Sequence, residues 1–173
     1  MKDNKLQILD IIPGTSVDGP GLRTSIYLAG CNHQCPECHN PQSWDFAGGK
    51  AMSVEEILDV VEENGFNVTL TGGDPVYSAA NILPLVKILN EKGYKIWLYT
   101  GFLFEELLKM ESMRPILPMI EVVVDGPFKI ALKSLKVPFR GSTNQRLVDV
   151  ASSLTIGQIV EWTDPPTCYS LPV

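Results

Sequence analysis

The feature that most constrains this chain is a run of three cysteines, Cys31, Cys35 and Cys38, with the spacing C-x3-C-x2-C. Three thiolates this close in sequence can bind one inorganic centre from a single loop. A structural zinc site normally takes four ligands, and an iron–sulfur cube is usually held by four cysteines. Three cysteines would leave one iron without a protein ligand, as a catalytic zinc site leaves one position open. The spacing therefore predicts a metal loop with an open coordination position.

Other occupants of this loop stay open from the residues alone. A zinc site could add His33 or His39, or recruit Cys168, and a ferredoxin-like electron carrier would close all four corners of a cluster with cysteine. Structural zinc usually staples small domains that lack a core, whereas 45% of this chain is hydrophobic. We therefore favour a cluster, with Cys168 as a free thiol of the tail.

Composition and charge narrow the class of protein. The length of 173 residues suits one domain with one core, and the net charge of −6 argues against a nucleic-acid surface. The apolar runs are too short for a membrane span, and the N-terminus lacks the apolar region of a signal peptide. Clustered cysteines without a secretory signal favour a reducing cytoplasm. We expect a single cytoplasmic domain over 1–173, with an extended surface tail over 163–173 and neither nucleic acid nor membrane as a partner.

Strand and helix signals alternate along the chain. Ser53 and Glu56 form a capping-box pattern before a helix that ends at Gly65, and Asn81 is a candidate N-cap that puts Pro84 in the first turn of another helix. Further short strands are expected near the C-terminus, over 147–150 and 158–162. The main expected strands cover 5–12, 22–29, 67–71, 94–99 and 120–124, and the later helices cover 82–92 and 103–109. This alternation predicts βα units around a parallel sheet.

The chemically distinctive residues follow the predicted strands. Thr71-Gly72-Gly73-Asp74-Pro75 comes after the strand over 67–71, and Thr100 and Asp125 come after the next two strands. Functional groups gather at the carboxyl ends of parallel strands, so we expect these residues to meet the cysteine loop. Paired glycines often mark only a turn, but they can also expose backbone to a ligand, whose ammonium group Asp74 could bind.

Taken together, these motifs resemble the radical S-adenosylmethionine enzymes, through GCNHQCPECHNPQSW and TGGDP. More narrowly, VDGPGLRT (17–24), IWLYTG (96–101), VDGPF (124–128) and RGSTNQ (140–145) resemble the activating enzymes of glycyl-radical proteins. The last two phrases and the short length point within that family to the activators of anaerobic ribonucleoside-triphosphate reductases. The Cys-His-Asn-Pro run is shared with activators of pyruvate formate-lyase-like enzymes. A radical enzyme acting on a small molecule, of the deazapurine synthase type, is the other alternative.

The resemblance implies a set of site residues. Cys31, Cys35 and Cys38 would ligate a [4Fe–4S] cluster, whose open iron binds the amino and carboxylate groups of S-adenosylmethionine. Position 37 departs from the family, which often has Gly or an aromatic residue there. The resemblance implies that Glu37 and His39 lie near the adenosyl part. It implies that Gly72, Gly73 and Asp74 hold the methionine ammonium, and that Thr100 and Asp125 line the methionine or ribose side.

For the whole protein, the resemblance implies an α/β fold of the open partial (β/α) barrel type, smaller than an eight-unit barrel. It implies that an electron from the reduced cluster breaks the carbon–sulfur bond of S-adenosylmethionine. The resulting 5′-deoxyadenosyl radical would take a hydrogen atom from a glycine of the partner. That partner is expected to be an anaerobic ribonucleotide reductase, and the electron would come from a one-electron donor such as flavodoxin.

Overall fold

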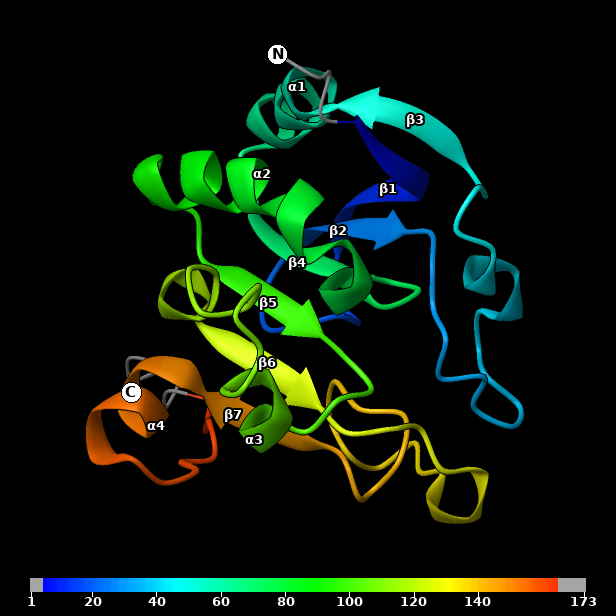
Figure 1. Cartoon of the computed structure of the whole chain (residues 1–173), viewed down its shortest axis with the longest axis vertical. Helices are drawn as coiled ribbons and strands as arrows, with labels where there is room; N and C mark the ends of the chain where they lie inside the picture. Colours follow the sequence, from blue (N-terminus) through cyan, green and yellow to red (C-terminus); the bar gives the residue numbers. More distant parts are fainter. Residues whose placement is uncertain (1–4, 165–173) are drawn as a thin grey trace, which may run out of the picture.

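The computed structural model describes residues 5–164, which form one seven-stranded open sheet in the order β3-β1-β2-β4-β5-β6-β7 (Figure 1). The central strands β2, β4, β5 and β6 are parallel, whereas β1, β3 and β7 pair antiparallel at the two edges. The fold is therefore α/β with a mixed sheet, so the predicted parallel sheet is correct for the centre only. The strands are β1 (Lys5–Thr15), β2 (Arg23–Leu28), β3 (Lys50–Ser53), β4 (Asn67–Gly72), β5 (Ile96–Tyr99), β6 (Val122–Asp125) and β7 (Arg146–Asp149).

The helices follow the predicted order with shifted bounds. The capping box is present at Ser53, and Gly65 ends α1 in the left-handed conformation with φ of 68°. No helix within residues 5–164 is long and apolar enough to cross a membrane. The helices are α1 (Val54–Asn64), α2 (Ala79–Glu91), α3 (Phe104–Leu107) and α4 (Val150–Ile156), with 3-10 turns over Pro41–Trp44, Pro75–Ser78, Leu117–Met119 and Ile130–Leu132.

The predicted start of α2 is wrong. The helix begins at Ala79 rather than near Ile82, because the 3-10 turn over Pro75–Ser78 runs directly into it. Its N-cap position is therefore Ser78 instead of Asn81, and Pro84 lies inside the helix rather than in its first turn.

The C-terminal part differs most from the expectation. The strand predicted over 158–162 is only an isolated bridge between Glu161 and Val148, and the helix α4 was not predicted. Local caps define α4, because the Asp149 carboxylate accepts from the Ser152 N–H at 2.8 Å and Gly157 ends the helix. Residues 165–173 lie outside the described residues, and with them Cys168 and most of the predicted tail.

The two faces of the sheet bury different side chains. The larger core packs the helices against Leu28, Leu70 and Leu98, among others. The opposite face carries a smaller cluster around the fully buried Trp97. Successive side chains of a strand point to opposite faces, so Tyr99 shares the face of Trp97 and not that of Leu98. This second face borders a cavity, which Tyr99 and Phe139 help to line.

Candidate active site

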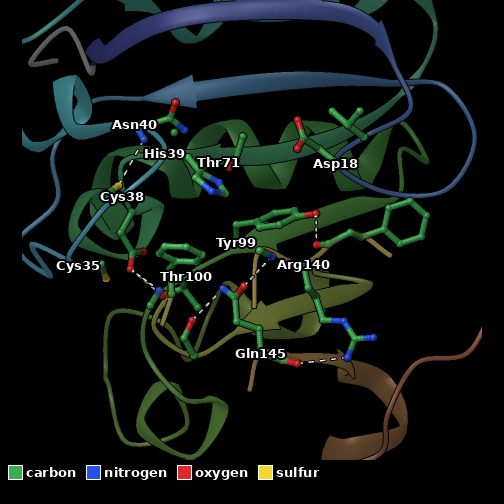
Figure 2. A pocket seen from close by; sticks show the side chains of 18 of the residues that line it. Asp18, Cys35, Cys38, His39, Asn40, Thr71, Tyr99, Thr100, Arg140 and Gln145 are labelled. Carbon is green, nitrogen blue, oxygen red and sulfur yellow. Dashed lines mark hydrogen bonds between the residues drawn. The ribbon is translucent and has the colours of Figure 1, made fainter. Parts of the chain in front are cut away.

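A cavity of about 700 Å³ opens at the carboxyl ends of the central parallel strands. Its lining combines the cysteine loop, the ends of β4 and β5, and the segment after β6. Figure 2 shows Cys35, Cys38 and His39 toward one end and Asp18 and Arg140 toward the other. The fold thus brings residues that are far apart in sequence around one space.

The cysteine loop is anchored where it leaves β2. The Gly30 N–H donates to the Ser43 carbonyl at 2.7 Å, and the Cys31 N–H donates to the Trp44 carbonyl at 3.4 Å. Gly30 has φ of 104°, and a Cβ there would lie 2.4 Å from the ring of Phe46. Only glycine therefore fits this root without moving the aromatic ring.

The tip of the loop carries the thiols. The Cys38 N–H donates to the Cys35 carbonyl at 3.1 Å, and the Asn40 N–H donates to the Cys38 Sγ at 3.4 Å. All three cysteines are half-buried free thiols that line the cavity. Burial raises the pKa of the Cys31 and Cys35 thiols, because desolvation disfavours the thiolates.

The donor set fits an iron–sulfur cluster held at three corners. Thiolates are the ligands that iron–sulfur clusters take in proteins. The three thiols lie around one space, yet within residues 5–164 no three His, Cys, Asp or Glu side chains converge on a position for a single metal ion. The remaining cysteine of the chain, Cys168, belongs to the tail beyond the described residues.

The paired glycines let β4 end against the root of the cysteine loop. A Cβ on Gly72 would lie 2.5 Å from the backbone of Leu28, and a Cβ on Gly73 would lie 2.5 Å from the Gly30 carbonyl oxygen. In this close approach the Gly73 N–H donates to the Leu28 carbonyl at 2.7 Å, and the Asp74 N–H donates to the Gly30 carbonyl at 2.9 Å. Both glycines also face the cavity.

The Asp74 carboxylate joins three segments of the chain. It is 2% exposed, and its Oδ1 accepts from the Val76 N–H at 3.0 Å. Its Oδ2 accepts from the Thr100 hydroxyl at 2.8 Å, from the Gly101 N–H at 2.9 Å and from His33 Nε2 at 2.7 Å. Asp74 therefore ties the cysteine loop to the ends of β4 and β5 through donors of the chain itself.

His33 is a residue whose role sequence reasoning missed, since we considered it only as a zinc ligand. Its ring packs against Phe102 with centroids 4.6 Å apart and against Tyr77 at 5.5 Å. A Cβ on Gly101 would lie 2.6 Å from the His33 ring, so that glycine makes room for it. The signal was the glycine directly after the strand end, read beside a histidine inside the cysteine motif.

The remaining predicted site residues divide between the cavity wall and other places. Thr100 and His39 line the cavity, and the His39 ring lies 4.8 Å from that of Phe128. Glu37 is exposed and is not among the lining residues. The residues that the structure brings around the cavity are Cys31, Cys35, Cys38, His39, Gly72, Gly73, Asp74 and Thr100.

Asp125 lies apart from this group. It is the last residue of β6, fully buried, and its side chain is not part of the cavity lining. Its Oδ2 accepts from the Phe104 N–H at 2.8 Å at the start of α3, and its Oδ1 accepts from Arg146 Nε at 3.0 Å. The carboxylate therefore holds α3 and β7 to the sheet in this structure.

Two tyrosines flank the middle of the cavity. The Tyr99 hydroxyl donates to the Phe139 carbonyl at 2.7 Å, and the Tyr27 hydroxyl donates to Asp18 Oδ2 at 2.8 Å. Burial raises the pKa of both phenols, which stay neutral donors at physiological pH.

The comparisons with known proteins bear on this site. The chain matches the model of the 4Fe-4S single cluster domain over residues 17–148, which contain the cysteine loop and the strand ends. It is 34% identical over 145 residues to the anaerobic ribonucleoside-triphosphate reductase-activating protein of Pasteurella multocida, covering 77% of this chain and 90% of that protein. This chain belongs to the family of anaerobic ribonucleoside-triphosphate reductase-activating proteins.

Other members of the activating-protein family align similarly. The protein of Enterobacteria phage T4 is 33% identical over 79% of this chain and 90% of its own length. That of Escherichia coli K12 is 34% identical over 77% of this chain and 92% of its own length. The crystal structure of QueE from Escherichia coli superposes with a TM-score of 0.46 at 24% identity, covering 56% of this chain and 53% of that one.

The match to the 4Fe-4S single cluster domain confirms the predicted [4Fe–4S] cluster over the zinc alternative.

Proposed function

We propose that the chain cleaves S-adenosylmethionine reductively and generates a glycyl radical on an anaerobic ribonucleoside-triphosphate reductase. One observation carries this proposal: three free thiols, with no fourth cysteine in residues 5–164, line a cavity large enough for a nucleoside-sized ligand. An open cluster corner beside such a cavity is what a bound sulfonium nucleoside requires.

In this proposal the cysteines set the position of the reaction. Cys31, Cys35 and Cys38 hold the cluster at the cavity wall, and the Asn40 N–H supports the Cys38 sulfur. The cluster would supply the one electron for reductive cleavage of the carbon–sulfur bond of S-adenosylmethionine, so that the 5′-deoxyadenosyl group could take a hydrogen atom from a glycine of the partner. The cavity walls restrict water and hold the reactants at close range.

The other site residues have proposed contacts with S-adenosylmethionine. Gly72 and Gly73 would present their backbone to the methionine ammonium, and the Asp74 carboxylate, which accepts four hydrogen bonds from the chain, would act there mainly by shaping this wall. His39 would contact the adenosyl part and Thr100 the methionine or ribose side, and the lining of the cavity by both residues supports these contacts. Direct contacts from Glu37 and Asp125 would need rearrangement of an exposed turn and of a buried ion pair.

The proposal extends to the whole molecule. The four parallel strands, with helices on one face and the cavity at their carboxyl ends, are compatible with an open partial (β/α) barrel of the radical S-adenosylmethionine type. We place the protein in the cytoplasm as a single domain over 1–173, where a one-electron donor such as flavodoxin reduces the cluster. Neither nucleic acid nor a membrane is required.

Isotope transfer tests this function. The anaerobic reductase is prepared with glycine deuterated at Cα and mixed anaerobically with the reduced, cluster-loaded chain and S-adenosylmethionine. The proposal predicts one deuterium in the 5′-deoxyadenosine that forms. Unlabelled 5′-deoxyadenosine formed at the same rate with and without the reductase would contradict the proposal, because its hydrogen would then not come from the reductase.

A further inference from the structure

The charges of this acidic chain are unevenly distributed. Residues 126–148 carry five of its 14 Lys and Arg residues and none of its 20 Asp and Glu residues, although the net charge is −6. This basic stretch directly follows β6. In Figure 1 it leaves the sheet at the arrowhead ends of the parallel strands, as the cysteine loop does.

The middle of the stretch, residues 129–140, is a loop whose first half is hydrogen-bonded to residues 141–143. The Lys129 N–H donates to the Ser142 hydroxyl at 3.2 Å, and the Thr143 N–H donates to the Leu132 carbonyl at 2.9 Å. Figure 2 shows Arg140 at the end of the cavity away from Cys35 and Cys38. The residues of the loop that line the cavity are Ser134, Leu135, Val137, Pro138, Phe139 and Arg140. We call residues 129–140 the basic loop.

Within residues 5–164, the lysine side chains of the basic loop form no ion pair. Lys129, Lys133 and Lys136 are exposed, and none of them lies within ion-pair distance of a carboxylate in the part of the chain that the structure describes. Arg146, at the end of the same basic stretch, pairs with Asp125 and Glu105. The three ammonium groups are therefore available to another molecule.

Exposed apolar side chains alternate with these lysines. Leu135 is 97% exposed at the edge of the cavity, and Ile130 and Leu132 are 40% and 41% exposed. Single exposed apolar residues are ordinary, but three within six positions, between unpaired cations and beside a reaction cavity, resemble the mixture of anchors and charges found in interfaces.

We propose that the basic loop is the surface on which the glycine-bearing partner protein docks, and that the partner presents an acidic segment with apolar side chains to it. The inference rests on the proposed function, which requires a protein segment to enter the cavity. An acidic partner is repelled by most of this chain and attracted to residues 129–140, which orients it toward the cavity. Leu135 then becomes buried at the centre of the contact.

Charge reversal tests the proposal. We would measure the affinity of the cluster-loaded chain for the purified anaerobic reductase of the same organism by isothermal titration calorimetry, at low and at physiological salt. The variant K129E/K133E/K136E should bind at least tenfold more weakly, and Leu135→Ser about fivefold more weakly. The affinity of the unchanged protein should fall as salt rises, because exposed charge pairs are screened.

Matched controls separate docking from general charge and from chemistry. The variant K50E/K87E/K109E carries the same charge change at exposed lysines elsewhere and should bind as the unchanged protein does. Cleavage of S-adenosylmethionine without the reductase should change less than twofold in K129E/K133E/K136E, because these three lysines do not line the cavity. The neutral variant K129Q/K133Q/K136Q should lie between the two if charge is the cause.

Three results would overturn the docking surface. The first is that K129E/K133E/K136E and the unchanged protein bind the reductase with equal affinity. The second is that the unchanged protein does not bind the reductase measurably. The third is that the lysines instead bind a single-stranded oligonucleotide or anionic vesicles. Lysine-dependent reductase binding with no glycyl radical would instead support the surface and refute the proposed function.

Discussion

The two walls of the cavity are built in opposite ways. The cysteine wall is held by buried and partly buried hydrogen bonds that join the cysteine loop to the ends of β4 and β5, and Asp74 accepts four of them. The basic loop is held by hydrogen bonds to residues 141–143 and to the Tyr99 hydroxyl, and it exposes Leu135 and three lysines. Cofactor chemistry needs a rigid geometry, whereas a partner surface needs accessible side chains. The difference therefore indicates which wall serves each task.

The largest expected effect comes from removing a ligand on the cysteine wall. Cys35→Ala should abolish both the intact cluster and cleavage of S-adenosylmethionine, because a cube held by two thiolates loses its support. Iron and sulfide content, visible absorbance and 5′-deoxyadenosine formation measure this. Cys168→Ala is the matched control and should keep both, and loss of the cluster in that variant would contradict the three-cysteine assignment.

The second effect tests the hydrogen bonds behind that wall. Asp74→Ala removes the acceptor of the Thr100 hydroxyl, of the His33 ring and of the Val76 and Gly101 N–H groups, and leaving a buried donor unpaired costs about 1–3 kcal/mol. We expect the free energy of unfolding of the cluster-free chain to fall by about 3 kcal/mol, and affinity for S-adenosylmethionine to weaken while the cluster can still assemble. Urea unfolding and equilibrium binding measure these. Asp74→Asn keeps one acceptor oxygen and should lose less, so equal losses would argue against the hydrogen-bond account.

The third effect compares equivalent substitutions on the two walls. Gly73→Ala forces a Cβ against the Gly30 carbonyl oxygen and should cost about 2 kcal/mol, as overpacked sites do. Gly141→Ala, beside the basic loop, meets side-chain atoms alone, the Phe128 ring at 3.1 Å and Gln145 Oε1 at 3.5 Å, and should cost under about 1 kcal/mol. Thermal unfolding of both variants measures the difference. Similar costs would mean that the walls are equally rigid.

A substitution in the basic loop should change the free energy of unfolding least. Leu135→Ser should change the free energy of unfolding by less than about 0.5 kcal/mol, since the side chain is 97% exposed. Chemical denaturation of the isolated chain checks this. A loss of several kcal/mol would show that Leu135 is packed, and would remove the reason for assigning it to a partner.

The sequence predicts the cysteine wall better than the rest because its signals are local. The C-x3-C-x2-C run, the paired glycines and the capping box at Ser53 each act within a few residues, and the carboxyl ends of parallel strands then meet at one edge. Asp125 shows the limit. It is the last residue of β6 instead of a loop residue, and a shift of one position along a strand changes the face on which its side chain lies. The His33–Asp74 contact spans 41 positions, and Gly101 marks room for the His33 ring without specifying Asp74 as its partner.

Electron spin resonance detects the glycyl radical itself. The reduced, cluster-loaded chain is mixed anaerobically with S-adenosylmethionine and the anaerobic ribonucleoside-triphosphate reductase, and the frozen mixture is examined for a glycine-centred radical. The account predicts this signal on the reductase with the unchanged protein and its absence with Cys35→Ala. Cleavage of S-adenosylmethionine to 5′-deoxyadenosine without any glycine-centred signal would contradict it.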